Sequence, residues 1–219
     1  MISRGICFDM DGTLIDSGPG SLRQIFKVAR LLNLSVTPEI EQRLRTIWGQ
    51  RASDLIKAAW PNIDIDRFCK QWEDLDIAEP WPTFPGTKKA LKKLFEKFPL
   101  SILTNRNFRT TISQLEYNDL LQFFGLVITA DSSPYKKPDP QSIESILEKY
   151  RGVGVNPKQV IFVGDTVEGD WKLAQAVGIE FFAVLSGGMD SKEKFLAVGV
   201  PEDHIFDSVA HLTPVLLRK

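Results

Sequence analysis

The stretch Ile6-Cys7-Phe8-Asp9-Met10-Asp11-Gly12-Thr13-Leu14 is the part of this sequence from which its fold and chemistry can be worked out. The apolar run at residues 6–8 predicts a buried strand, and Gly12 marks the turn that follows it. Two carboxylates this close repel each other, and burying either one unpaired is costly. Magnesium, which prefers hard oxygen ligands, would neutralise both acids. The alternative is a turn with two solvated aspartates, and this motif alone leaves that alternative open.

The composition narrows the class of protein. The 219 residues carry a formal net charge of -1, and no basic block indicates a nucleic-acid partner. No apolar stretch approaches the roughly 20 residues of a membrane span. The apolar run at residues 6–8 is also too short for a signal peptide. Cys7 and Cys69 are expected to be reduced thiols, so we expect a cytoplasmic protein without a membrane or nucleic-acid partner.

The region after Leu14 predicts a separate helical unit. Ser17-Gly18-Pro19-Gly20 is expected to form a loop that acts as a hinge. Four helical patterns follow, and their N-termini are expected near Ser21, Thr37, Ser53 and Asp66. The Pro-rich and Gly-containing segment 79–86 blocks helix formation and is interpreted as the return linker. We therefore predict a helical domain at residues 17–82, inserted into a core domain formed by residues 1–16 and 83–219.

Alternating helices and strands are predicted from Thr87 onward. Strands are expected at residues 100–103, 126–129, 160–163, 181–185 and 205–206, with helical patterns between them. Such alternation is typical of a parallel sheet with helices on both faces. The predicted fold class is therefore α/β, with a Rossmann-like doubly wound parallel sheet as the core and an all-helical insertion.

Polar side chains follow four of the predicted strands, where ligands bind in doubly wound sheets. They are Asp9 and Asp11, then Thr104 and Asn105, then Lys136 and Lys137, and finally Asp165, Glu168 and Asp170. This inventory suits phosphoryl transfer. Magnesium held by Asp9 and Asp165 could shield the charge of a phosphate ester, and Lys137 could neutralise more. A carboxylate could attack phosphorus and form an aspartyl phosphate. A second acid two residues later could protonate the leaving oxygen and then activate water.

These motifs resemble the haloacid dehalogenase-like hydrolase superfamily, in the branch that contains phosphoglycolate phosphatase-like and β-phosphoglucomutase-like proteins. The resemblance covers almost the whole chain. Its motifs are Asp9-Met10-Asp11-Gly12-Thr13-Leu14, Leu103-Thr104-Asn105, Lys137-Pro138 and Val163-Gly164-Asp165-Thr166, in family order. The helical insertion is similar to the type 1 cap of that superfamily, and Phe84-Pro85-Gly86 resembles the stretch that re-enters the core.

The resemblance implies a role for each matching residue. Asp9 would be the nucleophile and a magnesium ligand. Asp11 would be the general acid/base, with its backbone carbonyl on the metal. Thr104 and the backbone amides near Asn105 would bind the transferring phosphoryl group, and Lys137 would steady the nucleophile and the phosphate. Asp165 would complete the metal site.

The last acid departs from the pattern of many relatives. It falls five positions after Asp165, at Asp170, whereas in many relatives the corresponding spacing is four positions. The spacing from Asp170 to Gly178 matches the family, so Gly169 or a neighbour is interpreted as a one-residue loop insertion. Asp170 is expected at the metal, directly or through water, with Glu168 as the alternative ligand. A helix N-cap role for Asp170 is also compatible with this position.

The expected reaction is magnesium-dependent hydrolysis of a small phosphate monoester through an aspartyl phosphate on Asp9. The resemblance favours phosphate esters, because dehalogenases and phosphonate-cleaving relatives lack an acid at the position of Asp11. One alternative is a sugar-phosphate mutase. Such mutases use a cap histidine, and no His precedes His204 here. Another is a catalytically silent relative that binds phosphate or protein. A receiver domain and an EF-hand calcium loop fit the sequence poorly.

The cap is expected to select the substrate, a small phosphorylated metabolite, by closing over the core. Gln50 and Arg51 lie between predicted cap helices, where relatives often contact substrate, so both are candidate substrate-binding residues. Arg106 is another candidate, with a surface role as the alternative. The sequence leaves the identity of the ester and the oligomeric state open.

Overall fold

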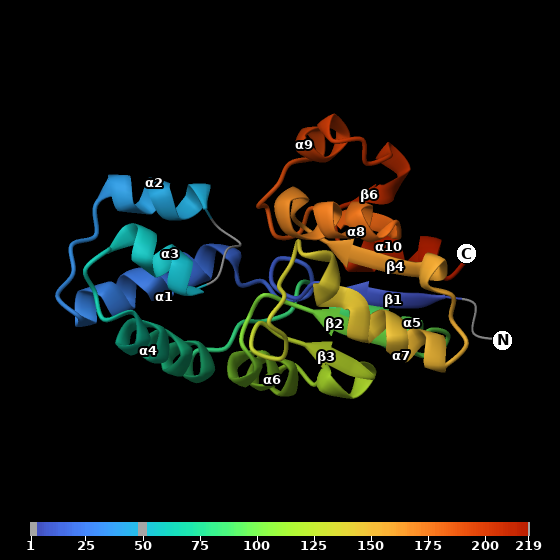
Figure 1. Cartoon of the computed structure of the whole chain (residues 1–219), viewed down its shortest axis with the longest axis horizontal. Helices are drawn as coiled ribbons and strands as arrows, with labels where there is room; N and C mark the ends of the chain where they lie inside the picture. Colours follow the sequence, from blue (N-terminus) through green and yellow to red (C-terminus); the bar gives the residue numbers. More distant parts are fainter. Residues whose placement is uncertain (1–3, 48–51, 219) are drawn as a thin grey trace.

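The computed structural model describes residues 4–47 and 52–218 and contains a parallel β-sheet flanked by helices (Figure 1). The strands are β1 (Gly5–Phe8), β2 (Leu100–Leu103), β3 (Leu126–Ile128), β4 (Val160–Gly164), β5 (Glu180–Val184) and β6 (Ile205–Phe206). Their order in the sheet is β3-β2-β1-β4-β5-β6, and every pair is parallel. The first strand therefore lies centrally, and the winding direction changes between β1 and β4.

The sheet is covered on both faces, as the near-continuous apolar runs of its strands require. Alternate side chains of β1 enter different apolar clusters, with Ile6 and Phe8 in one and Cys7 in the other. The first cluster includes α5 (Thr87–Phe95), α6 (Phe108–Tyr117) and α10 (Val209–Leu216). The second includes α7 (Glu144–Gly152), α8 (Lys172–Val177) and α9 (Lys192–Ala197). The predicted α/β fold class is therefore confirmed.

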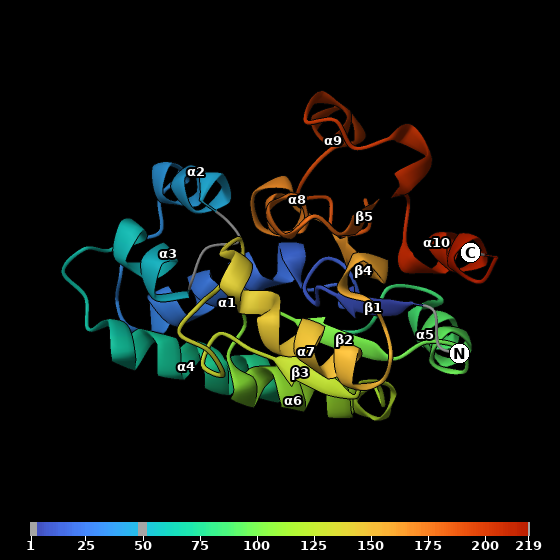
Figure 2. The same cartoon turned by 45° about the vertical axis from the view of Figure 1, so that its right-hand side comes forward.

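Four helices lie to one side of the sheet, at the opposite end of the molecule from both termini (Figures 1 and 2). They are α1 (Gly18–Leu31), α2 (Pro38–Thr46), α3 (Ala52–Ala59) and α4 (Ile65–Ala78). Their apolar faces form a cluster of their own, which includes Ile25, Leu44, Ile56 and Phe68. In residues 4–47 and 52–218, no helix has the length and apolar character needed to cross a bilayer.

Side-chain caps explain where α2 and α4 begin. The predicted Thr37 cap of α2 is confirmed, because its Oγ1 accepts from the Ile40 N–H at 3.4 Å. The predicted start of the fourth helix near Asp66 is also close, with Asp64 as the actual cap of α4. The predicted cap at Ser53 is wrong, because α3 already begins at Ala52.

The start of α1 corrects the predicted loop at residues 17–20. Ser21 is not the cap but lies inside the helix, where its hydroxyl donates to the Ser17 carbonyl at 2.7 Å. Tertiary packing overrides the weak helix propensity of glycine here. A Cβ on Gly20 would lie 2.2 Å from the indole ring of Trp81, so a residue without a side chain lets the two segments touch.

The chain leaves and re-enters the sheet domain through two neighbouring segments. Ile15 bridges to Thr83, and the Asp16 N–H donates to the Pro82 carbonyl at 2.9 Å. The Phe84 N–H donates to the Leu14 carbonyl at 3.2 Å. We therefore retain as a proposal the division into a cap at residues 17–82 and a core at 1–16 and 83–219. The separate apolar cluster of α1–α4 supports it.

Phe68 provides a test of the cap packing. It is fully buried and stacks on Trp60, with 5.5 Å between ring centroids. Phe68→Ala should lower the free energy of unfolding by about 3–5 kcal/mol, because a cavity replaces the ring. Urea denaturation measures this change. The control Phe108→Ala removes a ring that is 52% exposed and should change stability by less than about 0.5 kcal/mol. Equal effects of the two substitutions would contradict the packing described here.

Candidate active site

The sheet brings three of the predicted residues together at the carboxyl ends of neighbouring strands. Asp9 follows β1, and its N–H donates to the Val163 carbonyl of β4 at 2.8 Å. Asp165 follows β4, next to Asp9 at the point where the winding reverses. Thr104 follows β2, and its N–H donates to the Ile128 carbonyl of β3 at 3.0 Å. Strand pairing therefore sets the positions of these side chains.

Lys137 reaches into this group from the loop after β3. Its buried Nζ lies 2.6 Å from Asp9 Oδ1 and 2.6 Å from Asp170 Oδ1. The carboxamide of Asn105 forms hydrogen bonds with both the backbone N–H and the backbone carbonyl of Lys137. Asn105 Oδ1 accepts from the Lys137 N–H at 3.1 Å, and Nδ2 donates to its carbonyl at 3.1 Å. The Asn105 side chain therefore positions Lys137. The binding of phosphate by backbone amides near Asn105 stays a prediction.

Asp9, Asp165 and Asp170 form a buried acidic cluster, each offering an oxygen within 4.8 Å of the others. Burial, followed by repulsion from Asp9 and Asp170, raises the pKa of Asp165 well above its usual value. Asp165 Oδ1 accepts a long bond from the Thr13 hydroxyl at 3.4 Å, whereas Oδ2 is buried without a hydrogen-bond partner. An orphaned carboxylate oxygen in a set of oxygen donors fits a divalent cation. This cluster could therefore hold a metal ion.

The loop after Asp9 lies directly against this cluster. Gly12 has φ = 77°, and a Cβ there would lie 2.1 Å from Asp165 Oδ2. A side chain is therefore excluded by both conformation and space. The Gly12 carbonyl accepts from the Ser186 hydroxyl at 2.9 Å, so the segment after β5 also supports the loop. Sequence reasoning missed Ser186, although Ser186-Gly187-Gly188 directly follows a predicted strand end.

The extra residue before Asp170 forms part of a π-helical turn, Val167–Trp171, and not of an open loop. The Trp171 N–H donates to the Thr166 carbonyl at 3.1 Å, which accommodates one additional residue in the turn. Asp170 is not an N-cap, because Thr166 takes that position and donates to Asp170 Oδ2 through its hydroxyl at 2.7 Å. Glu168 is exposed and pairs with Lys172 at 2.5 Å. The geometry therefore favours Asp170 over Glu168 beside Asp9.

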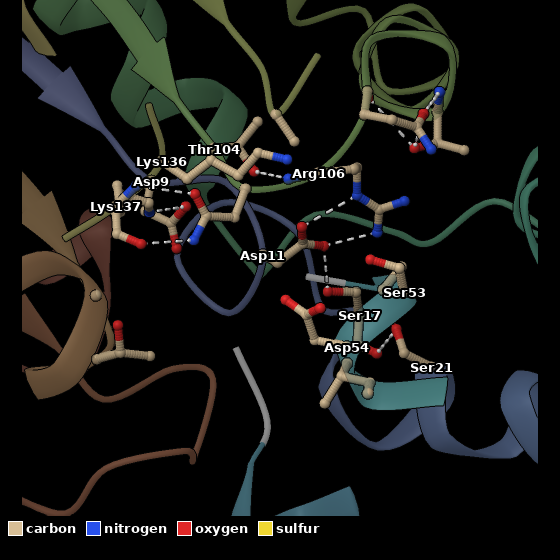
Figure 3. Close-up of a pocket in the computed structure, with 18 of the residues that line it drawn as sticks. Asp9, Asp11, Ser17, Ser21, Ser53, Asp54, Thr104, Arg106, Lys136 and Lys137 are labelled. Atoms are coloured by element: carbon tan, nitrogen blue, oxygen red, sulfur yellow. Dashed lines mark hydrogen bonds and ion pairs between the residues drawn. The ribbon is translucent and has the colours of Figure 1, made fainter. Parts of the chain in front are cut away.

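Asp11 lies apart from the acidic cluster and has partners of its own (Figure 3). Its Oδ1 accepts from the Ser17 hydroxyl at 2.6 Å and from an Arg106 guanidinium nitrogen at 2.7 Å. Its Oδ2 accepts from Arg106 Nε at 3.0 Å. The Asp11 side chain is partly buried, which disfavours ionisation, but Arg106 and Ser17 outweigh this effect and hold the pKa of Asp11 below its usual value. The alternative of a surface role for Arg106 is wrong, since its side chain is only 12% exposed.

A cavity of about 890 Å³ lies between the sheet ends and the helical unit. Asp9, Asp11, Thr104 and Lys137 line its core side. Leu55 of α3, together with Ile65, Cys69 and Trp72 of α4, contributes to the opposite wall. Gln50 and Arg51 lie outside the described residues, so their predicted substrate contacts stay predictions. Cys7 and Cys69 are free thiols, as predicted.

The sequence and fold of this chain are similar to those of known proteins. Residues 6–184 match the family model of the haloacid dehalogenase-like hydrolases. The chain is 30% identical to the phosphoglycolate phosphatase of Escherichia coli K12, covering 97% of this chain and 92% of that protein. The enzyme of the same name from Salmonella typhi is 28% identical, with the same coverage.

Solved structures share the fold. A predicted phosphoglycolate phosphatase from Haemophilus somnus superposes with a TM-score of 0.83 at 22% identity, over 99% of both chains. A haloacid dehalogenase-like family hydrolase from Streptococcus pneumoniae gives a TM-score of 0.78 at 21% identity, also over 99% of both chains. At these identities the likeness concerns the fold.

The acidic cluster predicts a pH-dependent stability in the absence of metal. Burial raises the pKa of Asp9 from 3.8 to about 7, against the opposing charge of Lys137. A carboxyl whose pKa is raised by folding stabilises the protein at low pH, and that stability is lost as pH rises through the folded pKa. Between pH 5 and pH 8 in chelator, the free energy of unfolding should fall by on the order of 2 kcal/mol. Urea titrations at both pH values measure the change.

Asp9→Asn is the control for this titration, because the amide cannot take up a proton. Its stability should change less between pH 5 and pH 8 than that of the wild type. A wild-type protein that is equally stable at both values, or more stable at pH 8, would contradict the raised pKa.

Proposed function

Because the chain belongs to the haloacid dehalogenase-like hydrolase family, we propose that it is a magnesium-dependent phosphatase that hydrolyses a small phosphate monoester. The observation that carries this proposal is the contact of the Lys137 ammonium with Asp9, at 2.6 Å, beside the orphaned oxygen of Asp165. A nucleophilic carboxylate that must approach an anionic phosphate needs such neutralising charge around it. The phosphatase names of its curated relatives support the same reaction.

In the first step an Asp9 carboxylate oxygen attacks phosphorus and forms an aspartyl phosphate. The bond between phosphorus and the leaving oxygen breaks, and that oxygen takes a proton from the protonated form of Asp11, which leaves this step as a carboxylate. Lys137 balances charge on Asp9 and on the phosphoryl group, and the Thr104 hydroxyl donates to a phosphoryl oxygen. In the second step water attacks phosphorus while Asp11 accepts its proton. Inorganic phosphate leaves, and Asp9 is regenerated as a carboxylate.

Magnesium is proposed at the acidic cluster, held by Asp9, Asp165 and Asp170, with the backbone carbonyl of Asp11 as a further ligand. When bound, it would shield the phosphate charge from the attacking carboxylate and keep Asp9 ionised at neutral pH. Lys137 contacts both Asp9 and Asp170, so it already offsets part of the repulsion among the ligands.

The remaining alternatives have less support. A mutase of this superfamily would require a cap histidine, but the first histidine of the chain is His204, beyond residues 17–82. His204 Nδ1 lies 3.0 Å from the Phe181 carbonyl in the sheet domain. A silent relative would need no closely arranged nucleophile, lysine and acidic cluster. A small phosphorylated metabolite, a cytoplasmic location and the absence of nucleic-acid binding remain predictions of this proposal.

Replacing the nucleophile tests the covalent mechanism. Asp9→Asn should lower phosphate release from the best substrate of a monoester panel by at least about 10³-fold, because an amide cannot attack phosphorus. Phosphate release with magnesium present is the measurement. The control Asp74→Asn changes an exposed acid of α4 and should retain most activity. A fully active Asp9→Asn protein would rule out the aspartyl phosphate.

Metal binding can be tested without turnover. Magnesium at about 100 times its dissociation constant should stabilise the folded wild type by about 2.7 kcal/mol. Asp165→Asn removes a proposed ligand and should abolish most of this gain, which thermal unfolding with and without magnesium measures. An undiminished magnesium effect in Asp165→Asn would place the ion elsewhere.

A further inference from the structure

Arg106 links the helical unit to the proposed acid/base through one guanidinium group. Nε and one terminal nitrogen donate to the two oxygens of Asp11, at 3.0 and 2.7 Å. The other terminal nitrogen pairs with Asp76, near the end of α4. Only arginine offers this planar fork of donors, which can hold one carboxylate with two nitrogens and a second carboxylate with the third.

The Asp76 end of this link is itself firmly held. Its side chain is 5% exposed, and Oδ1 accepts from the Trp81 indole N–H at 2.8 Å. Its backbone carbonyl accepts from Gln114 Nε2 of α6 at 3.1 Å. Asp76 is therefore fixed from the sheet domain and from the return linker, so Arg106 is braced against a rigid point.

The Asp11 end is fixed from two sides. Ser17 donates to Oδ1 from the start of α1, and Arg106 donates to both oxygens from the segment after β2 (Figure 3). The Arg106 N–H also donates to the Thr104 hydroxyl at 3.1 Å. The Asp11 carboxylate is consequently held in one orientation beside the residue proposed to bind phosphate.

We propose that Arg106, braced by Asp76, is a positioning residue that holds the Asp11 carboxylate for activating water, and thereby makes turnover depend on how α4 docks. This inference rests on the proposed phosphatase function. A base that accepts a proton from attacking water must be fixed as a carboxylate within reach of that water. In the step concerned, water oxygen bonds to phosphorus, its proton passes to Asp11, and the bond from phosphorus to Asp9 breaks.

A second pair between the same elements provides a matched control. Arg109 of α6 lies 2.6 Å from Asp74 of α4, but the two side chains are 57% and 50% exposed. Neither residue lines the cavity. Both pairs join α4 to the segment after β2, whereas only the Arg106 pair reaches Asp11. Asp74→Asn and Arg109→Gln should therefore leave turnover unchanged.

The test uses p-nitrophenyl phosphate with magnesium, because its leaving group departs without a proton. Arg106→Gln should slow only the water step, so kcat should fall by about 10- to 100-fold while kcat/KM stays within about threefold. KM should fall with kcat. Rapid-mixing absorbance should then show a burst of p-nitrophenolate approaching one per enzyme molecule, as the aspartyl phosphate accumulates.

Asp76→Asn should act in the same direction, with a smaller loss, because Arg106 keeps Asp11 but loses its brace. If the two residues act as one unit, adding Asp76→Asn to Arg106→Gln should lower kcat by less than about twofold more. Arg106→Lys should be intermediate, since an ammonium cannot form the fork.

Other outcomes would overturn the proposal. A raised KM with unchanged kcat would make Arg106 a substrate-binding residue. Equal losses of kcat and kcat/KM without a burst, together with a lower melting temperature, would indicate a structural role alone. Equal losses in Asp74→Asn would assign the effect to domain docking in general. Wild-type protein that releases phosphate from no member of a monoester panel, p-nitrophenyl phosphate included, would refute the proposed function itself, and with it this inference.

Discussion

The structure depends on the neutralisation of buried negative charge at the carboxyl ends of β1 and β4. The ammonium of Lys137 lies between Asp9 and Asp170, and Asp165 lies beside them. One lysine cannot balance the charge of three carboxylates. The folded chain therefore keeps uncompensated negative charge where the chemistry is proposed. This charge lowers stability but creates affinity for a cation, a common compromise at functional sites.

A second charge group lies between the sheet domain and the helical unit. Arg106 lies between Asp11 and Asp76, and its pKa is raised mainly by these two carboxylates against the opposing effect of burial. The charge groups around Lys137 and Arg106 give Asp9 and Asp11 different environments, which shift their pKa values in opposite directions. Burial raises the pKa of Asp9, whereas Arg106 and Ser17 hold the pKa of the partly buried Asp11 low. Without a metal ion these directions favour an ionised Asp11 and a protonated Asp9, so a cation bound beside Asp9 would be what restores the carboxylate that a nucleophile requires.

The sequence allowed the sheet and its strand-end residues to be predicted, because apolar runs and the polar residues after them are local signals. Family membership followed from the same motifs and is confirmed. The contacts of Arg106 could not be predicted from the sequence, because Asp11 lies 95 residues away along the chain and no local pattern links the two residues. The start of α1 was mispredicted for a similar reason, since Trp81 is distant from Gly20 in sequence. The residue before Asp170 was recognised as extra, but its π-helical conformation required coordinates.

The bridge between Ile15 and Thr83 has a consequence for how this protein can vary. The polypeptide departs and comes back at almost the same place, so the strands on either side keep their register whatever the length of the excursion. Lengthening a loop that begins and ends at one point adds little entropic cost, about 0.6 kcal/mol per doubling. The scaffold can thus tolerate new helices above an unchanged set of strand ends, so the helical unit can vary without disturbing the acidic cluster.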